Sequence, residues 1–190
     1  KLMPLVHLPV QSGSNKILKL MNRNHSIENY LETFNKLKEI NPKIEFSSDF
    51  IIAYPGEEDQ DFEDTLNLIK KVKFINSYSY IFSPRPGTVS GNLNLIDKRT
   101  SFDRLNRIQN ELFENQTQKN KSLENSIVEV LVENFTDDKT KTFGRSKYMT
   151  SVIFDGNKSD IGKIVQVKIH KSNRSTLFGE IVSNSSQKVA

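Results

Sequence analysis

The chain contains no cysteine and no tryptophan among its 190 residues. Without cysteine these residues can form no disulfide bond and can offer no thiolate ligand to a metal. No apolar run approaches the roughly 18–20 residues that a membrane-spanning helix needs, and no signal peptide opens the sequence. We therefore expect a cytoplasmic protein with no membrane segment.

Neither charge sign dominates the composition. Lysine and arginine total 27 and aspartate and glutamate total 23, so the net charge is +4, while 35% of the residues are hydrophobic. This is an ordinary balance for a soluble protein, and its length suits one or two domains. A mildly basic chain permits an anionic partner but does not require one.

The stretch from Leu5 to Arg23 is the most informative part of the sequence. It begins as a short apolar strand, Leu5 to Val10, breaks at Gln11-Ser-Gly-Ser14, and resumes as a helix with Ile17, Leu18 and Met21 on one side. This order predicts a βα unit, and ligands of α/β folds bind at the loop that follows the strand.

Three polar residues of this stretch are candidates for such a ligand. Gln11 and Ser12 can form hydrogen bonds at the turn, and Arg23 carries a fixed charge that suits a carboxylate or a phosphate. The alternative is that Gln11 and Ser12 only cap the helix and that Arg23 is solvated.

Residues 1–88 alternate strands and helices in the order β-α-α-β-α-β. Strands are expected over 44–54 and 76–82, and the apolar run Phe50–Ala53 suits a buried parallel strand. This order predicts part of a parallel β/α barrel, since a complete barrel needs about 250 residues. A long helix is expected over 97–123, with an inner face of Phe102, Leu105, Ile108 and Leu112.

From residue 124 the pattern changes to short strands, expected over 127–132, 142–145, 149–154, 164–169 and 177–182. Val165, Val167 and Ile169 alternate with polar residues, as in a half-buried strand. Five such strands predict a small barrel of the OB or SH3 kind. The predicted fold is therefore α/β followed by all-β, with domains at 1–96 and 124–190 and a connecting helix at 97–123.

Basic and aromatic residues are interleaved in the second domain. Lys139, Lys141, Arg145 and Lys147 surround Phe143 and Tyr148. Cations that contact phosphates and rings that stack on bases suit RNA binding, whereas the alternative is a solvated hairpin. The three histidines His7, His25 and His170 have no metal-site spacing, so we predict no metal site.

Four ordered motifs resemble one family. Residues 7–23 are similar to the fourth-strand region of radical S-adenosylmethionine (SAM) enzymes, and specifically to the methylthiotransferases. Ser47–Glu57 and Tyr78–Thr88 agree with the same family, and the C-terminal segment resembles a TRAM RNA-binding domain. The sequence Pro9-Val-Gln-Ser-Gly-Ser14 is most similar to the branch that modifies a tRNA adenosine next to the anticodon.

The resemblance implies an activity and cofactors for a longer protein. That protein would convert N6-isopentenyladenosine in the anticodon stem-loop of tRNA to its 2-methylthio derivative, using SAM and two [4Fe–4S] clusters, and would act as a monomer. Cluster ligands are thiolates. We therefore expect this chain to be the C-terminal part of such an enzyme, with no catalytic residue of its own and no activity alone.

The resemblance also implies site residues. Gln11 would bind the ribose or amino-acid end of SAM, Arg23 its carboxylate and Asp49 a ribose hydroxyl. Ser12 would also belong to the cofactor-binding residues. The backbone at Ala53, where the family usually has glycine, would flank the adenine.

Two of these assignments have alternatives. Arg85, in a stiff Pro-Arg-Pro-Gly turn, would contact substrate phosphate or would be only structural. Asp49 could instead be a buried carboxylate that the local backbone satisfies.

Two other functions compete with this one. A methylthiotransferase could act on a threonylcarbamoyl-modified tRNA adenosine or on a ribosomal protein. The branch that acts on the ribosomal protein usually has histidine after the residue equivalent to Gln11, where this chain has Ser12. The third possibility is a non-catalytic RNA-binding module, which the absence of cysteine favours.

Overall fold

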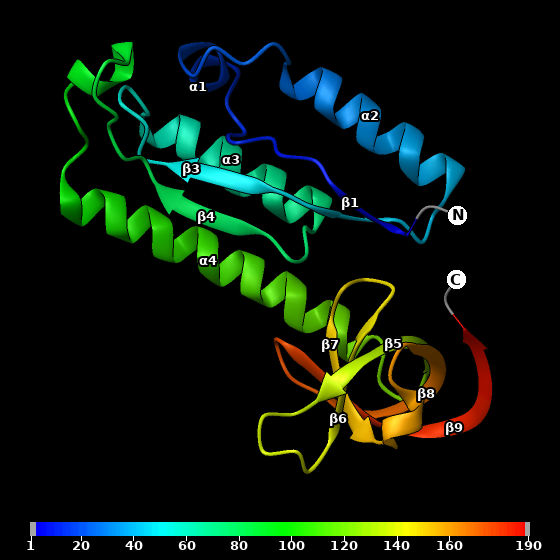
Figure 1. Ribbon diagram of the computed structural model, residues 1–190. Helices are drawn as coiled ribbons and strands as arrows, with labels where there is room; N and C mark the ends of the chain where they lie inside the picture. Colours follow the sequence, from blue (N-terminus) through cyan, green and yellow to red (C-terminus); the bar gives the residue numbers. More distant parts are fainter. Residues whose placement is uncertain (1–2, 189–190) are drawn as a thin grey trace. The chain divides into compact units, whose positions relative to one another are not determined.

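The computed structural model in Figure 1 describes residues 3–188, without the side chains of Asn92 and residues 183–188. The chain forms two compact units. One is Val6–Asn115, and the other is Gln116–Ala190 together with Lys1–Leu5. The boundary lies inside helix α4 (Lys98–Lys121), so this helix contributes to both. None of the helices described is both long enough and apolar enough to span a bilayer.

Four short strands form the sheet layer of the first unit, as two hydrogen-bonded pairs: β1 (Leu5–His7), β2 (Glu45–Ser47), β3 (Asp49–Ile52) and β4 (Tyr78–Ile81). β1 pairs with β2, and β3 pairs with β4 in parallel. A parallel bridge between Gln11 and Phe50 joins the chain after β1 to β3. The predicted α/β segment with parallel strands is confirmed.

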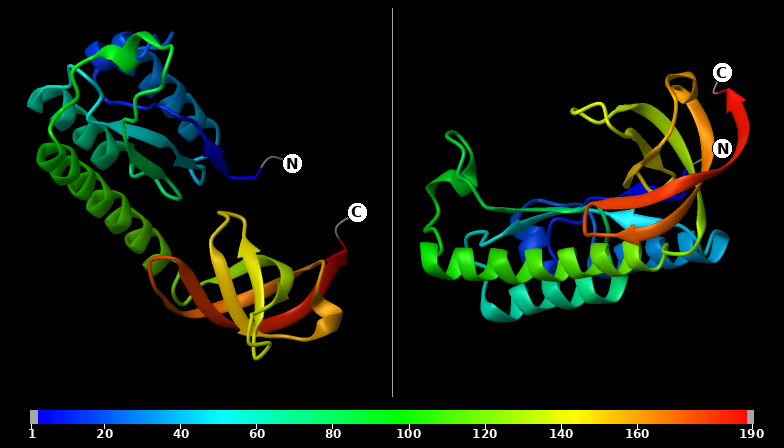
Figure 2. Two further views of the ribbon diagram at one scale, coloured as in Figure 1. Left: turned by 60° about the vertical axis from the view of Figure 1, so that its left-hand side comes forward. Right: turned by 90° about the horizontal axis from the view of Figure 1, so that it is seen from below.

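Helices cover one face of this sheet. They are α1 (Asn15–Leu20), α2 (Ile27–Ile40), α3 (Asp59–Val72) and the first part of α4. Figure 2 shows α2, α3 and α4 on the same side of the strands, where the core contains Phe46, Phe50, Ile52, Phe62, Ile69 and Ile108. The opposite face carries Tyr78 and Tyr80, whose side chains are 60% and 56% exposed.

The prediction of one strand over 44–54 is wrong, because the strand is interrupted at Ser48. The hydroxyl oxygen of Ser48 accepts a hydrogen bond from the Val10 amide at 2.9 Å, and the Ser48 amide donates to the Ser77 hydroxyl at 2.9 Å. Side-chain hydroxyls thus replace main-chain partners, which divides the strand into β2 and β3.

The inner face of α4 agrees with the prediction at Leu105, Ile108 and Leu112 but not at Phe102. Phe102 is 56% exposed, whereas Ser101 and Arg104 are buried together with Ile108 and Leu112. Arg104 donates through Nη1 to the Glu57 carboxylate at 2.8 Å and to the Glu57 carbonyl at 3.1 Å. A buried ion pair rather than an aromatic contact therefore decides which side of the helix faces inward.

The second unit contains a closed five-stranded barrel, as predicted. Its strands are β5 (Ile127–Phe135), β6 (Thr142–Ser146), β7 (Ser151–Asp155), β8 (Lys163–Ser172) and β9 (Thr176–Lys188), in the order β5-β6-β7-β9-β8. β9 pairs with β7 in parallel and with β8 in antiparallel fashion. Val165, Val167 and Ile169 are buried inside the barrel, which confirms the predicted alternation.

An asparagine near the end of α4 forms hydrogen bonds with this barrel. Asn120 is fully buried, and its Nδ2 donates to the carbonyls of Asn173 and Arg174, each at 2.9 Å. Gln116 in turn donates to the Asn120 amide oxygen at 3.0 Å. These bonds satisfy the turn between β8 and β9 with side chains from the helix.

Replacing Arg104 by methionine should lower the free energy of unfolding by about 3 kcal/mol at neutral pH, because the buried Glu57 carboxylate loses its counter-charge. The loss should shrink at acidic pH, where Glu57 can become neutral. Chemical denaturation monitored by circular dichroism measures both effects. As a control, Arg107→Met breaks the half-exposed pair with Glu63 and the contact of the guanidinium with the Phe62 ring, and should cost under about 1 kcal/mol. Equal losses in the two variants would contradict this account.

Candidate functional site

Gln11 lies where the chain leaves β1 and joins β3. Its backbone φ is +73°, its backbone amide donates to the Asp49 carbonyl at 3.0 Å, and its carbonyl accepts from the Ile51 amide at 2.9 Å. The residue is only 9% exposed, yet its side-chain amide forms no hydrogen bond to any residue that the structure describes. The Gln11 backbone is fixed by these bonds, and its side-chain amide has unused donors and an unused acceptor, so this amide can bind a polar ligand.

The rest of the turn packs against α3. The Gly13 amide donates to Thr65 Oγ1 at 2.8 Å, and the Ser12 hydroxyl lies 3.3 Å from the same atom. A methyl group on Gly13 would come within 2.4 Å of the Thr65 backbone, so only glycine fits here. Ser12 is buried, and its hydroxyl is engaged inside the fold, unlike the side-chain amide of Gln11.

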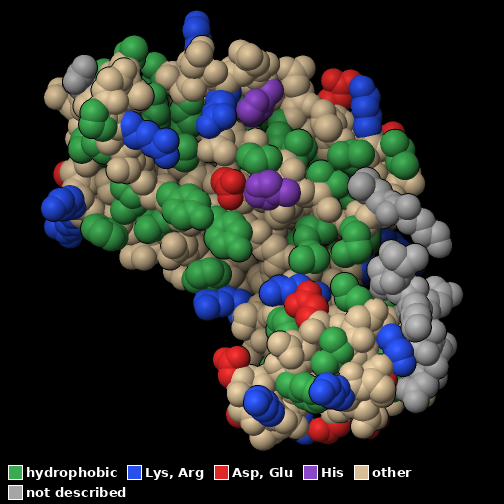
Figure 3. All heavy atoms as spheres, in the orientation of Figure 1, with side chains coloured by type: hydrophobic (Ala, Val, Ile, Leu, Met, Phe, Trp, Pro, Cys, Tyr) green, Lys and Arg blue, Asp and Glu red, His purple; other side chains and the backbone are tan. Residues whose placement is uncertain are grey.

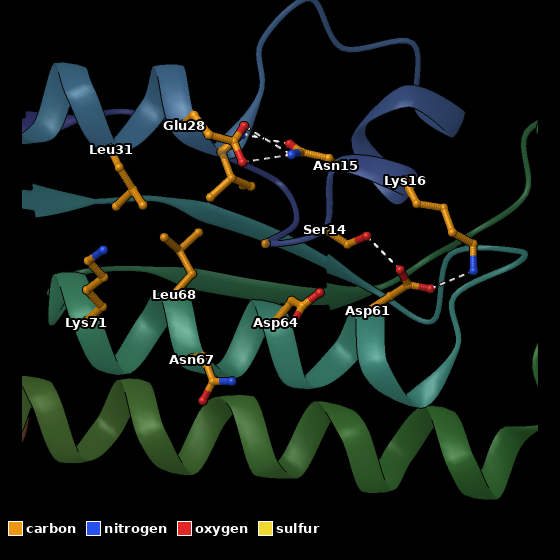
Figure 4. Close-up of a pocket in the computed structure, with 12 residues that line it drawn as sticks. Ser14, Asn15, Lys16, Glu28, Leu31, Asp61, Asp64, Asn67, Leu68 and Lys71 are labelled. Carbon is orange, nitrogen blue, oxygen red and sulfur yellow. Dashed lines mark hydrogen bonds and ion pairs between the residues drawn. The ribbon is translucent and has the colours of Figure 1, made fainter.

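A carboxylate of the same helix also holds this turn in place (Figure 4). Asp61 accepts from the Ser14 hydroxyl at 2.6 Å, from Lys16 Nζ at 2.8 Å and from the Glu58 amide at 2.9 Å. Burial by itself raises the pKa of Asp61, but the bonds from Lys16, Ser14 and the Glu58 amide outweigh it and lower the pKa below its usual value. These residues lie beside a cleft of about 510 Å³ between α1, α2 and α3.

Asp49 begins β3 and faces a histidine. His7 Nε2 lies 3.4 Å from the Asp49 carboxylate, and His7 Nδ1 lies 2.9 Å from the Ser47 hydroxyl. Asp49 is paired in register with Tyr78 on the sheet face that the helices leave open. In Figure 3 a histidine side chain lies beside an acidic one on this face, with hydrophobic side chains next to them. The partner of Asp49 is thus a side chain, not the local backbone.

Ala53 adopts a backbone conformation that favours glycine. Its φ is +58°, and its amide donates to the Glu57 carboxylate at 3.1 Å. Burial raises the pKa of Glu57, although the Ala53 amide and the Arg104 guanidinium act in the opposite direction. The usual family glycine therefore has a conformational reason at this position, apart from the closeness to adenine that the sequence suggested.

Two predicted arginines lie on exposed loops. Arg23 follows α1 next to Asn22, whose φ is +56°, and Arg85 lies in the turn before Gly87, whose φ is +80°. Neither guanidinium has an ion-pair partner within residues 3–188. The Arg85 carbonyl accepts from the Thr88 hydroxyl at 2.8 Å, which fixes the turn and leaves the Arg85 side chain available.

The four predicted cations of the barrel fall into two kinds. Lys141 forms an ion pair with Asp155 at 2.7 Å, and Arg145 lies 3.5 Å from Glu133. Lys139 is exposed, with no acidic partner in the described region, and Lys147 lies 5.5 Å from the ring of Tyr148. The ring of Tyr148 is buried, so it cannot receive a base, while Phe143 remains partly exposed.

Sequence comparisons agree with this division of the chain. The family model described as Radical SAM superfamily matches residues 2–69, and the TRAM domain model matches residues 121–182. The chain thus contains one segment that matches a radical SAM domain and one that matches a TRAM domain.

Three curated relatives share the name tRNA-2-methylthio-N(6)-dimethylallyladenosine synthase. The protein of Pelagibacter ubique is 66% identical over all 190 residues, that of Rickettsia akari 47% over 184, and that of Orientia tsutsugamushi 45% over 187. The chain spans 41–43% of the length of these relatives. The resemblance to methylthiotransferases is confirmed.

Within the radical SAM segment, sequence reasoning misses the residues that hold the site together. The sequence indicates Asp61 only as a negative charge near a helix start, and Arg104 only as part of a polar helix. Asp61 is 45 residues from its partner Lys16 along the chain, and Arg104 is 47 residues from Glu57. No local pattern signals such pairs. In the described part of the chain no cluster of three histidine, cysteine or acidic residues could hold a metal ion.

Replacing Ala53 by glycine should raise the free energy of unfolding by about 0.5–1 kcal/mol. The left-handed conformation costs an alanine about 1–2 kcal/mol, and part of the gain is offset by the greater freedom of glycine in the unfolded chain. Thermal and chemical unfolding measure the change. The neighbouring Gly56, with φ +87°, supplies the opposite control, since Gly56→Ala should destabilise the chain. A destabilised Ala53→Gly variant would refute the assigned strain.

Proposed function

We propose that this chain forms part of a tRNA methylthiotransferase, in which the radical SAM segment supplies one rim of the SAM pocket and the TRAM domain holds tRNA. The longer protein would convert N6-isopentenyladenosine next to the anticodon to its 2-methylthio derivative in the cytoplasm, as a monomer. The observation that carries the proposal is the 66% identity, over every residue of the chain, to a protein of that name.

The residues fit one of the implied cofactors and not the other. The sequence has no cysteine, so the thiolates that hold [4Fe–4S] clusters must come from outside these 190 residues. SAM fits better, because a buried amide, a carboxylate and an unpaired guanidinium are available on the described part of the first unit. Bound beside a cluster, SAM supplies the radical and, from a second molecule, the methyl group; the protein binds and orients it.

Each polar group of SAM would have its own partner in the protein. The unused amide of Gln11 would hydrogen-bond the amino-acid end or the ribose, and Arg23 would pair with the carboxylate. Asp49 would accept from a ribose hydroxyl, with His7 orienting its carboxylate. The backbone at Ala53 would flank the adenine, and Ser12 would act by keeping the turn after Gln11 against α3.

The substrate would meet cations in both units. Arg85, exposed on its stiff turn, would contact a phosphate of the anticodon stem-loop. In the TRAM domain Lys139 and Lys147 are better placed for phosphates than Lys141 and Arg145, because carboxylates already neutralise the latter two. Such contacts position an RNA but do not read its sequence.

In the longer protein, Arg23→Ala should weaken SAM binding by about 1.5–3 kcal/mol, the usual worth of a hydrogen bond to a charged group. Asp49→Asn should cost less, because an amide still bonds a hydroxyl. Isothermal calorimetry with SAM gives both affinities, and Arg99→Ala, an exposed arginine of α4, is the control that should change nothing. Wild-type affinity in the Arg23 and Asp49 variants would remove these residues from the pocket.

The double variant Lys139→Gln/Lys147→Gln should flatten the salt dependence of tRNA binding. For every phosphate that the protein no longer neutralises, the slope of log K against log salt should fall by about 0.7–0.9. The matched variant Lys141→Gln/Arg145→Gln should change the slope less, because Asp155 and Glu133 already offset the charges of these two cations. Fluorescence anisotropy with an anticodon stem-loop across potassium chloride concentrations measures the slopes. A larger effect from the paired cations would reverse the assignment.

A further inference from the structure

An apolar row crosses the outside of the TRAM barrel. Phe143 on β6 is paired in register with Ile153 on β7, and Ile153 is paired with Phe178 on β9. Residues opposite one another on neighbouring strands point to the same side and lie about 5 Å apart. The three side chains therefore form one continuous strip.

This strip lies outside the barrel core. The flanking residues Thr142, Val152 and Leu177 are buried, whereas Phe143, Ile153 and Phe178 are partly exposed. None of the three belongs to the hydrophobic cluster that fills the barrel. The barrel thus keeps two phenylalanine rings partly exposed at its surface.

One side of the strip is lined with hydrogen-bond donors. Two residues further along each strand, Arg145, Ser151 and Thr176 form a parallel row in the same register. Two strand residues span about 7 Å. Arg145 donates to the Met149 carbonyl at 3.1 Å and keeps its guanidinium 5.4 Å from the ring of Phe143.

The other side of the strip is acidic. Asp155 and Glu180 are paired in register across β7 and β9, and they contact Lys141 and His170 respectively. At its β6 end the strip meets a hollow of about 590 Å³, lined by Glu133, Asn134, Phe135, Thr136, Asp137 and Phe143. Negative charge on this side repels phosphates, so a nucleic acid would turn its backbone toward the opposite row, where Arg145 offers hydrogen-bond donors although Glu133 offsets its charge.

We propose that the strip Phe143–Ile153–Phe178 is a stacking surface for unpaired RNA bases, with the sugar–phosphate backbone along Arg145, Ser151 and Thr176. This rests on the proposed tRNA-binding function and deepens it, because it names the part of the RNA that the TRAM domain contacts. Aromatic rings next to a row of donors suit single-stranded RNA, in which base faces are accessible. A paired stem hides those faces, and the strip would not bind it.

The test uses the 190-residue chain and a short single-stranded RNA that carries 2-aminopurine. The double variant Phe143→Leu/Phe178→Leu keeps apolar side chains but removes both rings. Its affinity should fall about 5- to 100-fold, as expected for the loss of base stacking. The quenching of 2-aminopurine on binding should be lost, while the salt slope stays the same because no charge has changed.

Two controls establish whether the rings themselves bind the RNA. Ile127, an exposed residue of the outer barrel that pairs with Lys168 outside the strip, can be replaced by alanine and should leave RNA affinity unchanged. Circular dichroism and thermal unfolding establish that the phenylalanine variants remain folded. Ser151→Ala/Thr176→Val should weaken binding without abolishing the quenching.

The possible results distinguish a failure of the stacking surface from a failure of the proposed tRNA function. If the chain binds the RNA and the phenylalanine variant binds equally well, the stacking surface is refuted while the tRNA function stands. If the chain binds only duplex RNA, the stacking surface is also refuted. If it binds no RNA at all, both proposals fail for the TRAM domain. If the variant instead loses self-association with unchanged RNA affinity, the strip is a protein contact.

Discussion

Buried carboxylates set the geometry of the first unit. Asp61 draws Ser14, Lys16 and the Glu58 amide together, so the turn after Gln11 and the start of α3 share one anchor. Glu57 does the same for the turn at Ala53 by joining its amide to Arg104 on α4. A polar group buried with all its partners holds one arrangement firmly, and losing one partner is costly. The turns that follow β1 and β3 therefore depend on the buried acids Asp61 and Glu57.

This dependence explains which elements the sequence predicts correctly. Elements with a clear period were predictable: the alternation of Val165, Val167 and Ile169 indicated a barrel strand. The turn after β1 was predictable because glycine and serine have strong local preferences. The predictions failed where a distant side chain decided the outcome. Ser48 divided a strand through contacts with Val10 and Ser77, and Arg104 turned α4 away from Phe102.

The candidate site shows the same limit. Gln11, Asp49 and Ala53 could be proposed because a family pattern marks them, yet their environments could not. No local pattern indicates that Asp49 faces His7, that Ala53 is left-handed, or that Ser12 is engaged with Thr65. In the TRAM domain the count of lysines and arginines overstated the free positive charge, because Asp155 and Glu133 neutralise two of them. The number of charged residues in a segment therefore does not give the net charge that its surface presents.

The pairing of β9 has a consequence for how the TRAM domain is made. This last strand stands between β7 and β8 in the barrel order, and it bonds to both. Until β9 emerges from the ribosome, β7 and β8 each keep an open edge and the barrel cannot close. Closure then requires the parallel pairing of β9 with β7, a non-local contact with β8 between them in the chain, and such contacts form more slowly than hairpin pairings. The nascent domain would therefore pass through an interval in which exposed strand edges favour association with other chains.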